Sequence, residues 1–406
     1  MNKKMKDNFF YDACVIGAGA SGLAAASELA SRGYRTVLIE QNKKSGRKLY
    51  ATGNGRCNLA NAVLSDSAYY GNLFAKSVVS AESVQDLTDW LEGIGIPLTD
   101  RNGYLYPKSL QASSVVWALT DAARLAGAEF LYDTKVTEIC SDSGRSWIIK
   151  TEGTAARTIR SERLVLSMGS PAARGLGAAK ASELYSLFDN LSLEYRPYQP
   201  ALCPLETEED VRLLSGVRAG CRMTLLHGDS REEEEGEVQF TEYGISGIVT
   251  FNLATLADVK DTVLLNLLPE WASDDELLSF LRGQSQKRSA FGAFNGVLHE
   301  KVISYAFERL SLGKGKRALS EWQDQELIRI IGHLGNMPLT VSGKKGDQGQ
   351  AACGGVLCRL LDPDTMQVKG RPTLAITGEV TDVVGRCGGY NLMYALISGL
   401  RAGRNL

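Results

Sequence analysis

The chain is poor in the residues that hold metal ions. Its 406 residues include only three histidines, none of them in an HExxH pattern, and its eight cysteines never fall into a CxxC spacing. Zinc sites are usually built from such clusters, so we expect no metal site. Scattered free thiols are typical of a reducing compartment, which favours a cytoplasmic protein.

Charge and hydropathy exclude further classes. The formal net charge is −2 and no long basic block occurs, so the composition predicts no nucleic-acid partner. The apolar stretch at residues 13–30 is interrupted by glycines and by Glu28, so it predicts neither a signal peptide nor a membrane span. The one marked charge run, Arg231 to Glu237, is interpreted as a solvated hairpin tip. These features favour a protein without stable membrane association that acts on a small molecule.

The strongest positive signal is a glycine-rich turn near the start of the chain. Apolar residues 13–16 predict a buried parallel strand that leads directly into the glycine turn 17–22. An alanine-rich helix is expected to follow to about Ser31. Residues 36–39 predict the next strand, and the acid Glu40 follows it. This order of strand, glycine turn, helix, strand and acid is typical of dinucleotide-binding proteins.

Each glycine of this turn has a separate role in such proteins. Gly17 allows the tight turn, Gly19 lets the backbone approach a pyrophosphate, and Gly22 lets helix and strand pack closely. The helix N-terminus then faces the phosphates. Glu40 is placed to accept hydrogen bonds from an adenosine ribose and to repel a 2′-phosphate, which favours FAD or NAD over NADP. The alternative is a glycine-rich turn in an unrelated α/β unit.

A second glycine-rich segment spans residues 46–58. It contains too much glycine, asparagine and arginine to form a regular element. Its free backbone N–H groups and the cations Arg47, Lys48 and Arg56 suit an anionic, planar ligand that the backbone must approach closely. The alternative is an ordinary surface loop.

A third motif lies near the C-terminus. Residues 372–377 predict a strand, Glu379 follows it, and the pair Gly388–Gly389 precedes a small-residue helix at 392–402. The acid can hold a chain of sugar-like hydroxyls, and the glycine pair presents N–H groups to an acceptor-rich ring edge. A flavin offers both features and nicotinamide does not, so the motif favours FAD. A C-terminal helix packed on the sheet is the alternative, and it explains the small residues without the acid.

The remaining periodicity divides the chain into a core and an insertion. Helices are expected at 81–95 and 113–126, a hairpin or loop at 103–109, and strands at 130–139, at 147–150 and from 164. The character of the sequence changes near residue 195 and changes back near 345. We therefore expect an α/β fold with a split FAD-binding domain, residues 1–194 and 346–406, and an inserted substrate domain of strands and helices, residues 195–345.

These motifs resemble a known family. The segments 46–58, 378–391, 240–247 and 362–366 are similar to the signature segments of the HI0933-like (YhiN/BaiN-type) FAD-dependent oxidoreductases. The resemblance spans nearly the whole chain. It implies an FAD-binding Rossmann domain of the glutathione-reductase type, interrupted by an insert with a small β-barrel and a helical part at about 271–335.

The resemblance also implies a set of cofactor-binding residues. They are expected to line the pyrophosphate, the adenosine, the ribityl chain and the flavin edge of FAD, and they are Gly17, Gly19, Ala20, Ser21, Gly22, Glu40, Gln41, Arg47, Lys48, Thr52, Gly53, Gly55, Arg56, Cys57, Val136, Gly169, Gly378, Glu379, Gly388, Gly389, Tyr390 and Asn391. Two positions depart from the family pattern, Val384 where an acid is common and Cys387 where Thr or Pro is common.

The resemblance implies two activities that the pattern does not separate. The first is an NAD(P)H-dependent reductase of C=C bonds in an enone, such as a 3-oxo-dehydro-steroid or bile-acid intermediate. The second is an FAD-dependent amine oxidase of the aminoacetone type that uses O₂. A third hypothesis from another class, a flavin-dependent tRNA-modifying or RNA-binding protein, is disfavoured by the near-neutral charge and the lack of interleaved basic and aromatic residues.

The residues offer weak candidates for catalysis. Only one well-formed dinucleotide fingerprint occurs, so NAD(P)H is expected to bind transiently at the flavin face. Tyr106 and Tyr243 lie in glycine-flanked loops and are candidate proton donors, although packing roles suit them better. Cys57 is a candidate redox thiol, and the lack of a CxxC partner favours a role as a small neighbour.

Overall fold

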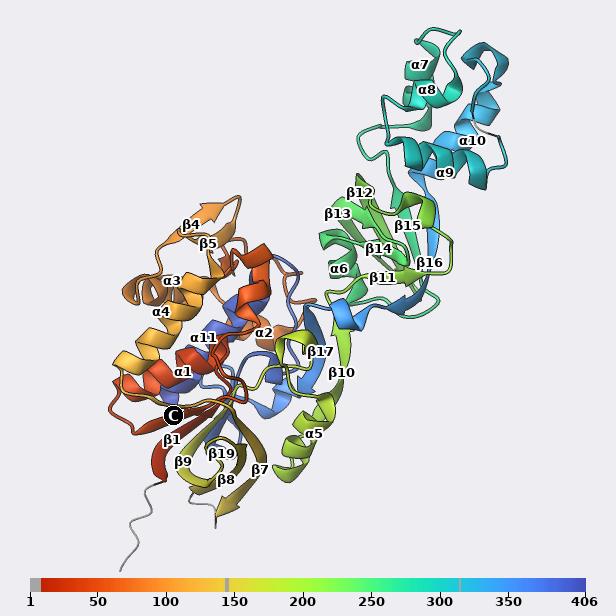
Figure 1. Cartoon of the computed structure of the whole chain (residues 1–406). Coiled ribbons are helices and arrows are strands. Elements are labelled where there is room, and N and C mark those ends of the chain that lie inside the picture. Colours follow the sequence, from red (N-terminus) through yellow and green to blue (C-terminus); the bar gives the residue numbers. More distant parts are fainter. Residues whose placement is uncertain (1–8, 143–145, 314) are drawn as a thin grey trace, which may run out of the picture. The chain divides into compact units, whose positions relative to one another are not determined.

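The computed structural model describes residues 9–142, 146–313 and 315–406, which form two compact units (Figure 1). The first unit joins Met1–Gln199 to Ala351–Leu406, and the second is Pro200–Gln350. Both boundaries between the units lie five residues after the domain boundaries predicted from the sequence. The reason is that two extended segments at the junctions, β10 (Tyr195–Ala201) and β17 (Ala351–Val356), pair with each other.

The second unit contains a closed six-stranded barrel. Its strands are ordered β11-β14-β13-β12-β15-β16, and neighbouring strands run antiparallel. Alternate side chains such as Val263, Leu265 and Leu339 are fully buried in its interior, as a half-buried strand requires. The small barrel that the resemblance implied is confirmed. Its strands are β11 (Leu205–Thr207), β12 (Arg218–His227), β13 (Ser230–Phe240), β14 (Gly244–Ser246), β15 (Thr262–Asn266) and β16 (Met337–Lys344).

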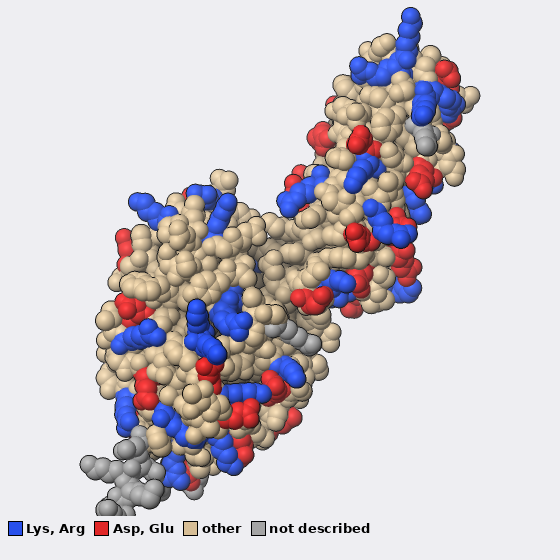
Figure 2. Space-filling view, in the orientation of Figure 1, with Lys and Arg blue, Asp and Glu red and all other residues tan. Residues whose placement is uncertain are grey.

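The interpretation of Arg231–Glu237 as a hairpin tip was wrong. These residues form most of β13 and pair with β12, and the turn itself lies between His227 and Ser230. The strand tolerates its acids because cations on β12 face them: Arg222 lies opposite Glu235, with nitrogen and oxygen 3.2 Å apart. Charged side chains of both signs are accordingly interspersed over the visible face of the barrel (Figure 2).

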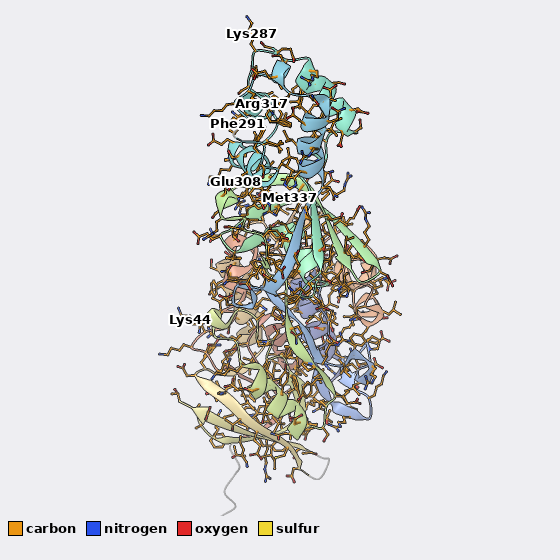
Figure 3. The ribbon with its side chains drawn as sticks, turned by 90° about the vertical axis from the view of Figure 1, so that its right-hand side faces the viewer. Lys44, Lys287, Phe291, Glu308, Arg317 and Met337 are labelled. Carbon is orange, nitrogen blue, oxygen red and sulfur yellow. The ribbon has the colours of Figure 1, made fainter. Side chains whose placement is uncertain are left out.

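A helical part lies between β15 and β16 in the sequence. Its helices are α7 (Asp274–Arg282), α8 (Ala290–Phe294), α9 (Glu300–Arg309) and α10 (Asp324–Gly335), and α6 (Ile248–Ala254) belongs to the barrel region. Phe294, Phe307 and Trp322 pack edge to face at its centre. Figure 3 shows this helical part beyond Met337, where β16 begins.

The first unit is built on a mostly parallel sheet ordered β18-β19-β9-β1-β2-β6. The strand predicted at 13–16 lies within β1, which begins three residues earlier, and it runs parallel to the predicted strand 36–39. The antiparallel hairpin β7–β8 is joined to the sheet through β9. The strands are β1 (Phe10–Ile16), β2 (Thr36–Ile39), β6 (Glu129–Leu131), β7 (Thr134–Asp142), β8 (Ser146–Gly153), β9 (Thr158–Leu166), β18 (Gln367–Val368) and β19 (Arg371–Ile376).

The single strand predicted at residues 130–139 is divided in two. β6 pairs in parallel with β2, whereas β7 pairs antiparallel with β8. Asp133 lies between them with a φ of 48°, which breaks the extended backbone. The apolar run therefore contains two strands that pair with different strands, and the sequence pattern did not show where the first ends.

Helices and a small second sheet complete this unit. The sheet β3-β5-β4 includes the hairpin expected near residues 103–109. The helices are α1 (Ala20–Ser31), α2 (Leu73–Val78), α3 (Ala81–Gly93), α4 (Ala112–Leu125), α5 (Ala181–Asn190) and α11 (Tyr390–Asn405), and the small strands are β3 (Ala60–Asn61), β4 (Leu98–Arg101) and β5 (Tyr104–Pro107).

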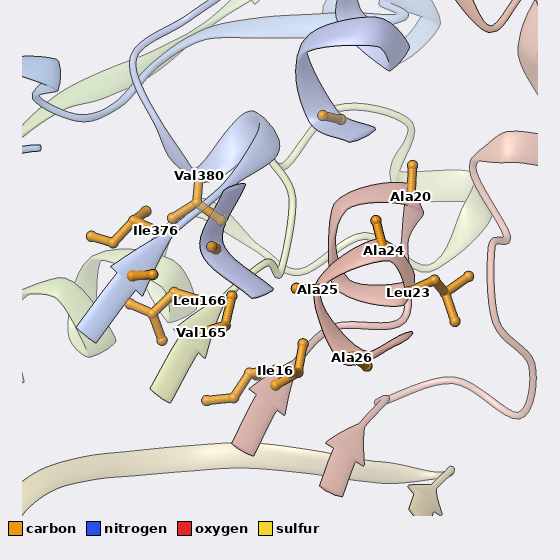
Figure 4. Packing of buried hydrophobic residues seen from close by; sticks show 14 of the residues in the cluster. Ile16, Ala20, Leu23, Ala24, Ala25, Ala26, Val165, Leu166, Ile376 and Val380 are labelled. Carbon is orange, nitrogen blue, oxygen red and sulfur yellow. The ribbon is translucent and has the colours of Figure 1, made fainter. Parts of the chain in front are cut away.

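The core of this unit depends on small residues. The alanine-rich face of α1 packs on the sheet near Ile16 and Leu166 (Figure 4). α11 crosses α1 closely, since a Cβ added at Gly399 would lie 2.3 Å from the carbonyl oxygen of Ser21. This close contact holds the start of α1 against the middle of α11. Within the described residues, no helix has the length and apolar character needed to cross a membrane.

Candidate dinucleotide site

Four parallel strands of the first unit end together. Ile16 at the end of β1 pairs with Ile39 on β2 and with Leu166 on β9, and Leu166 pairs in turn with Ile376 on β19. The residues that follow these strands therefore share one edge of the sheet. Ligands of open parallel sheets bind outside this carboxyl edge.

The three glycines of the first turn are required for different reasons. A Cβ on Gly17 would lie 2.4 Å from the carbonyl oxygen of Ser167, and one on Gly22 would lie 1.9 Å from that of Gly17. Both glycines are therefore fixed by packing. A Cβ on Gly19 would meet no protein atom within 4 Å. Gly19 is also the N-cap of α1, and no side chain of the described residues caps it, so the first N–H groups of the helix keep capacity for a ligand.

Glu40 follows β2 as predicted and is held by the turn itself. Its Oε2 accepts a hydrogen bond of 2.8 Å from the N–H of Ala18, and its Oε1 accepts from the backbone N–H of Asn42 at 2.8 Å. The side chain is nearly buried, with 8% of its surface exposed. The side-chain amide of Asn42 also donates to Oε1 at 2.6 Å, so Glu40 is fixed beside the glycine turn and its Oε2 keeps capacity for a further donor.

A partly buried ion pair joins the second and third motifs. Lys48 Nζ lies 2.8 Å from Oε1 and 2.6 Å from Oε2 of Glu379. The hydroxyl of Ser170, which follows β9, donates to the same Oε2 at 3.1 Å. Gly169 is the neighbour of this cluster, since a Cβ there would lie 3.9 Å from Glu379 Oε2. The structure therefore brings together three segments that are distant in the sequence.

The start of α11 forms the other end of the site. Gly389 is its N-cap with a φ of 96°, no side chain caps the helix, and Gly388 has a φ of 124°. The side chain of Asn61 donates to the carbonyl oxygen of Gly388 at 2.9 Å, which ties this start to β3. Asn58 is nine-tenths buried beside Gly389, and its Oδ1 has no hydrogen-bond partner among the described residues.

The segment 46–58 is less irregular than predicted. Residues 49–55 form the 3₁₀ segment η1 (Leu49–Gly55), broken where Gly53 and Asn54 adopt left-handed backbone conformations. Thr52 Oγ1 donates to the carbonyl oxygen of Leu49 at 2.7 Å, which stabilises the first turn. Gly55 and Arg56 are exposed. Exposed left-handed positions leave backbone groups open to a ligand.

Several predicted residues hold this edge together through protein contacts. Arg47 donates to Asn42 Oδ1, and Gln41 donates to the carbonyl oxygen of Gly177, both at 2.8 Å. The amide of Asn391 bonds both the N–H and the carbonyl oxygen of Gly385, again at 2.8 Å. Because of these contacts, the loops around the edge are fixed by the chain itself.

The other predicted residues lie at or beside the same edge. Ala20 begins α1, and Ser21 packs against Gly378, where a Cβ would lie 2.7 Å from the Ser21 hydroxyl. Tyr390 donates to the carbonyl oxygen of Val63 at 2.8 Å. Val136 is buried in β7, where the ladder with β8 becomes irregular.

The three catalytic candidates have different surroundings. Cys57 is fully buried, and burial raises the pKa of its thiol to about 11, so the thiol is protonated at neutral pH. Tyr106 lies on β5, with its ring 3.6 Å from the Cβ position of Gly53. Tyr243 belongs to the barrel unit, where its hydroxyl donates to Gln348 Oε1 at 2.7 Å. The structure thus brings Cys57 and Tyr106 to the glycine segment.

Sequence reasoning missed three residues of this region. Ser170 donates to Glu379, Asn58 lies beside Gly389, and Asp382 forms an ion pair with Arg196 at 3.3 Å while accepting from the N–H of Gly354. Burial raises the pKa of the Asp382 carboxyl despite Arg196. Asn58 ends the glycine segment and Ser170 follows a strand end, so their positions in the motifs were available as signals. No group of three potential metal ligands occurs within the described residues.

Comparison with known proteins agrees with this geometry. A family model, the HI0933-like protein Rossmann domain, matches residues 11–405. The chain is 31% identical to a 3-dehydro-bile acid delta(4,6)-reductase of Clostridium scindens, over 96% of this chain and 97% of the relative. It is 27% identical to a ribosomal RNA dihydrouridine synthase of Escherichia coli, over 98% of both chains.

A solved structure shows the same fold. The open conformation of a flavocytochrome c3 fumarate reductase aligns with a TM-score of 0.54 and 14% identity, over 98% of this chain and 78% of the other. The predicted fold class, a Rossmann domain of the FAD-binding type with an inserted barrel and helices, is therefore confirmed. The chain is an oxidoreductase, and it belongs to the HI0933-like family.

Proposed function

We propose that this protein is an FAD-dependent reductase that saturates a carbon–carbon double bond conjugated to a carbonyl group, with NAD(P)H as electron donor. The observation that carries the proposal is the shared edge at which the open turn at Gly19, the acid Glu379 and the uncapped start of α11 lie. A pyrophosphate, a hydroxyl chain and an electron-accepting ring need these three features in this order.

The residues present fit FAD. The space beside Gly19 is free of protein atoms, so the start of α1 would hold the pyrophosphate. Glu40 would accept from the adenosine ribose, and Glu379 from the ribityl hydroxyls. The buried Oδ1 of Asn58 accepts no hydrogen bond from the described residues, and an N–H of the ring system would satisfy it.

Bound FAD supplies hydride transfer, and the chain supplies binding and electrostatics. The start of α11, with Gly389 at its N-cap, favours negative charge in front of it. Lys48 neutralises Glu379, so the acid does not repel that charge. Gly177 follows the short 3₁₀ segment η2 (Arg174–Leu176), and its carbonyl oxygen accepts a hydrogen bond from Gln41. This glycine therefore does not belong to a second dinucleotide-binding motif that could hold NAD(P)H. The donor would therefore bind transiently at the same face.

The first substrate class is an enone in a steroid nucleus. The relative at 31% identity is named as a reductase of a 3-dehydro-bile acid, and it aligns over almost the whole of both chains. A double bond conjugated to a ketone accepts hydride at its β-carbon and a proton at its α-carbon. Tyr106, beside the glycine segment, and Tyr243, in the barrel unit, remain the candidate proton donors.

A second substrate class is uridine in ribosomal RNA. The relative at 27% identity is named as a dihydrouridine synthase. Dihydrouridine differs from uridine by saturation of a ring double bond that is conjugated to a carbonyl, so the two named reactions share one chemistry. The near-neutral net charge disfavoured RNA at the level of composition, and this relative is the specific observation that favours it.

An anaerobic stopped-flow experiment tests the proposal. The reconstituted protein is mixed with NADH or NADPH, and then with a 3-oxo-Δ4 steroid or a uridine-containing ribosomal RNA transcript. We expect loss of flavin absorbance near 450 nm with one nucleotide and its return with one substrate. Reduction by an amine, followed by peroxide on admission of air and with no nicotinamide requirement, would instead establish the amine oxidase alternative.

A further inference from the structure

Two loops of the helical part bring four cations together. Lys287 and Arg288 precede α8, and Lys316 and Arg317 precede the 3₁₀ segment η4 (Leu319–Glu321). We call these four residues the tip cluster. All four are exposed. Figure 3 shows Lys287 at the outer end of the helical part.

The two loops form a fixed platform. The N–H of Ala290 donates to the carbonyl oxygen of Arg317 at 3.0 Å, and the N–H of Leu319 donates to that of Arg288 at 2.8 Å. Arg282 supports the second loop from α7, since its guanidinium donates to the carbonyl oxygen of Leu319 at 2.8 Å. Backbone hydrogen bonds therefore hold the two loops that carry the four cations next to each other.

Most of this positive charge is not neutralised by the chain. Within the described residues, Lys287, Arg288 and Lys316 form no ion pair. Arg317 is the exception, because it pairs with Glu326 at 2.8 Å and lies 3.8 Å above the ring of Trp322. That stacking fixes its guanidinium plane.

The tip cluster stands out against an acidic background. Residues 200–350 contain 16 lysines and arginines against 23 aspartates and glutamates. Five of these acids lie on the barrel strand β13, where three of them pair with arginines. Blue side chains nevertheless gather at the outer end of the helical part in Figure 2. The cations of the barrel are largely paired with acids, so a polyanion would be attracted to the tip more strongly than to the barrel and the contact would be oriented.

We propose that the tip cluster binds the phosphate backbone of a structured RNA. The inference rests on the second substrate class of the proposed function, and it names the surface that would hold such a substrate. An RNA enzyme of this size needs contacts beyond the reacting base, because phosphate contacts supply most of the sequence-independent affinity. The near-neutral net charge of the whole chain predicted no nucleic-acid partner because it gives no information about such a local cluster.

The expected effect can be stated from counterion release. Four phosphate contacts give a slope of about −3 for log affinity against log salt, so affinity falls about sixtyfold between 50 and 200 mM salt. Reversing two of the four charges removes at least two of these contacts. We expect affinity to fall at least tenfold at 100 mM salt, and the slope to fall by about half.

The test uses the full chain and a defined probe. A fluorescein-labelled RNA hairpin of about 30 nucleotides, a length that spans the site size of a typical RNA module, is titrated by anisotropy at several salt concentrations. The variant K287E/R288E is compared with R212E/R231E, which makes the same change in net charge. Arg212 and Arg231 are exposed barrel residues paired with acids two positions away. Thermal unfolding of both variants controls for folding.

The outcomes separate this inference from the reductase proposal. Weaker binding in K287E/R288E alone supports the tip cluster. Equal losses in both variants, or no binding by the parent chain, would overturn it, and so would binding to phosphatidylserine vesicles instead of RNA. Steroid-enone reduction is measured in the same variants. If that activity persists while RNA binding is absent, this inference fails and the reductase proposal stands.

Discussion

Lys48 and Glu379 lie 331 positions apart in the sequence and form a two-fold contact, with Lys48 Nζ 2.8 Å from one carboxylate oxygen and 2.6 Å from the other. Lys48 belongs to the glycine segment and Glu379 follows β19. The pair is only partly exposed, at 34% and 17% of the two side chains. It fastens the two halves of the split domain at the edge of the sheet where the cofactor is proposed to bind.

Replacing Lys48 by Met should weaken flavin binding about tenfold and lower the free energy of unfolding by about 1 kcal/mol, since a half-buried carboxylate loses its charged partner. Flavin fluorescence titration and urea unfolding measure the two effects. Lys76→Met is the matched control, because Lys76 is equally exposed but pairs with the fully exposed Asp66. An equal loss of flavin affinity in both variants would refute the role of the pair.

The glycines of the first turn should respond differently to substitution. Gly19→Val should leave the apoprotein folded and abolish flavin retention, because its side chain enters space that no protein atom occupies. Gly22→Val should destabilise the apoprotein itself, because its Cβ would overlap the carbonyl oxygen of Gly17. Circular dichroism and flavin stoichiometry distinguish the two. Full flavin content in a folded Gly19→Val protein would show that the turn does not meet a ligand.

Cys57→Ser should leave flavin binding nearly intact and reduce turnover modestly. Burial raises the pKa of the Cys57 thiol from 9.0 to about 11. The contribution of the neutral thiol to folding stability is therefore fully present below pH 9, and it is lost as the pH rises through 11. Between pH 7 and 9 the pH–rate profiles of both proteins should therefore have the same shape. Complete loss of turnover with flavin still bound would make Cys57 a catalytic thiol.

Tyr243→Phe should slow substrate reduction more than flavin reduction by NAD(P)H, if the barrel unit carries substrate selectivity as we propose. The hydroxyl donates to Gln348, and Lys345 lies 4.9 Å above the ring, so the side chain is already oriented. Double-mixing stopped flow separates the two half-reactions. Normal reduction of the double bond in this variant would remove Tyr243 as proton donor.

Local pattern predicted the parts of the fold that depend on local physics. The strand ending at Ile16, the helix ending at Ser31 and the strand 36–39 all lie where the glycine turn and the apolar runs indicated. The start of α11 after Gly388–Gly389 was also predicted, because left-handed glycines end one segment and begin the next.

The remainder depends on partners that are distant in sequence. The acids of β13 were interpreted as a solvated hairpin tip because the neighbouring sequence does not show that Arg222 faces Glu235 across two paired strands. The apolar run 130–139 gave no sign that β6 and β7 have different partners. Within the candidate site, the motif residues were predicted individually, but the contact of Ser170 with Glu379 and the orphan oxygen of Asn58 arise only from packing.

The identity of the bound flavin tests the central claim most directly. The protein is reconstituted with a mixture of FAD and FMN, washed, denatured and analysed by mass spectrometry. The account predicts about one FAD per chain and no FMN, because the open start of α1 at Gly19 and the fixed acid Glu40 serve the pyrophosphate and adenosine that FMN lacks. Retention of FMN, or of no flavin by the folded protein, would contradict it.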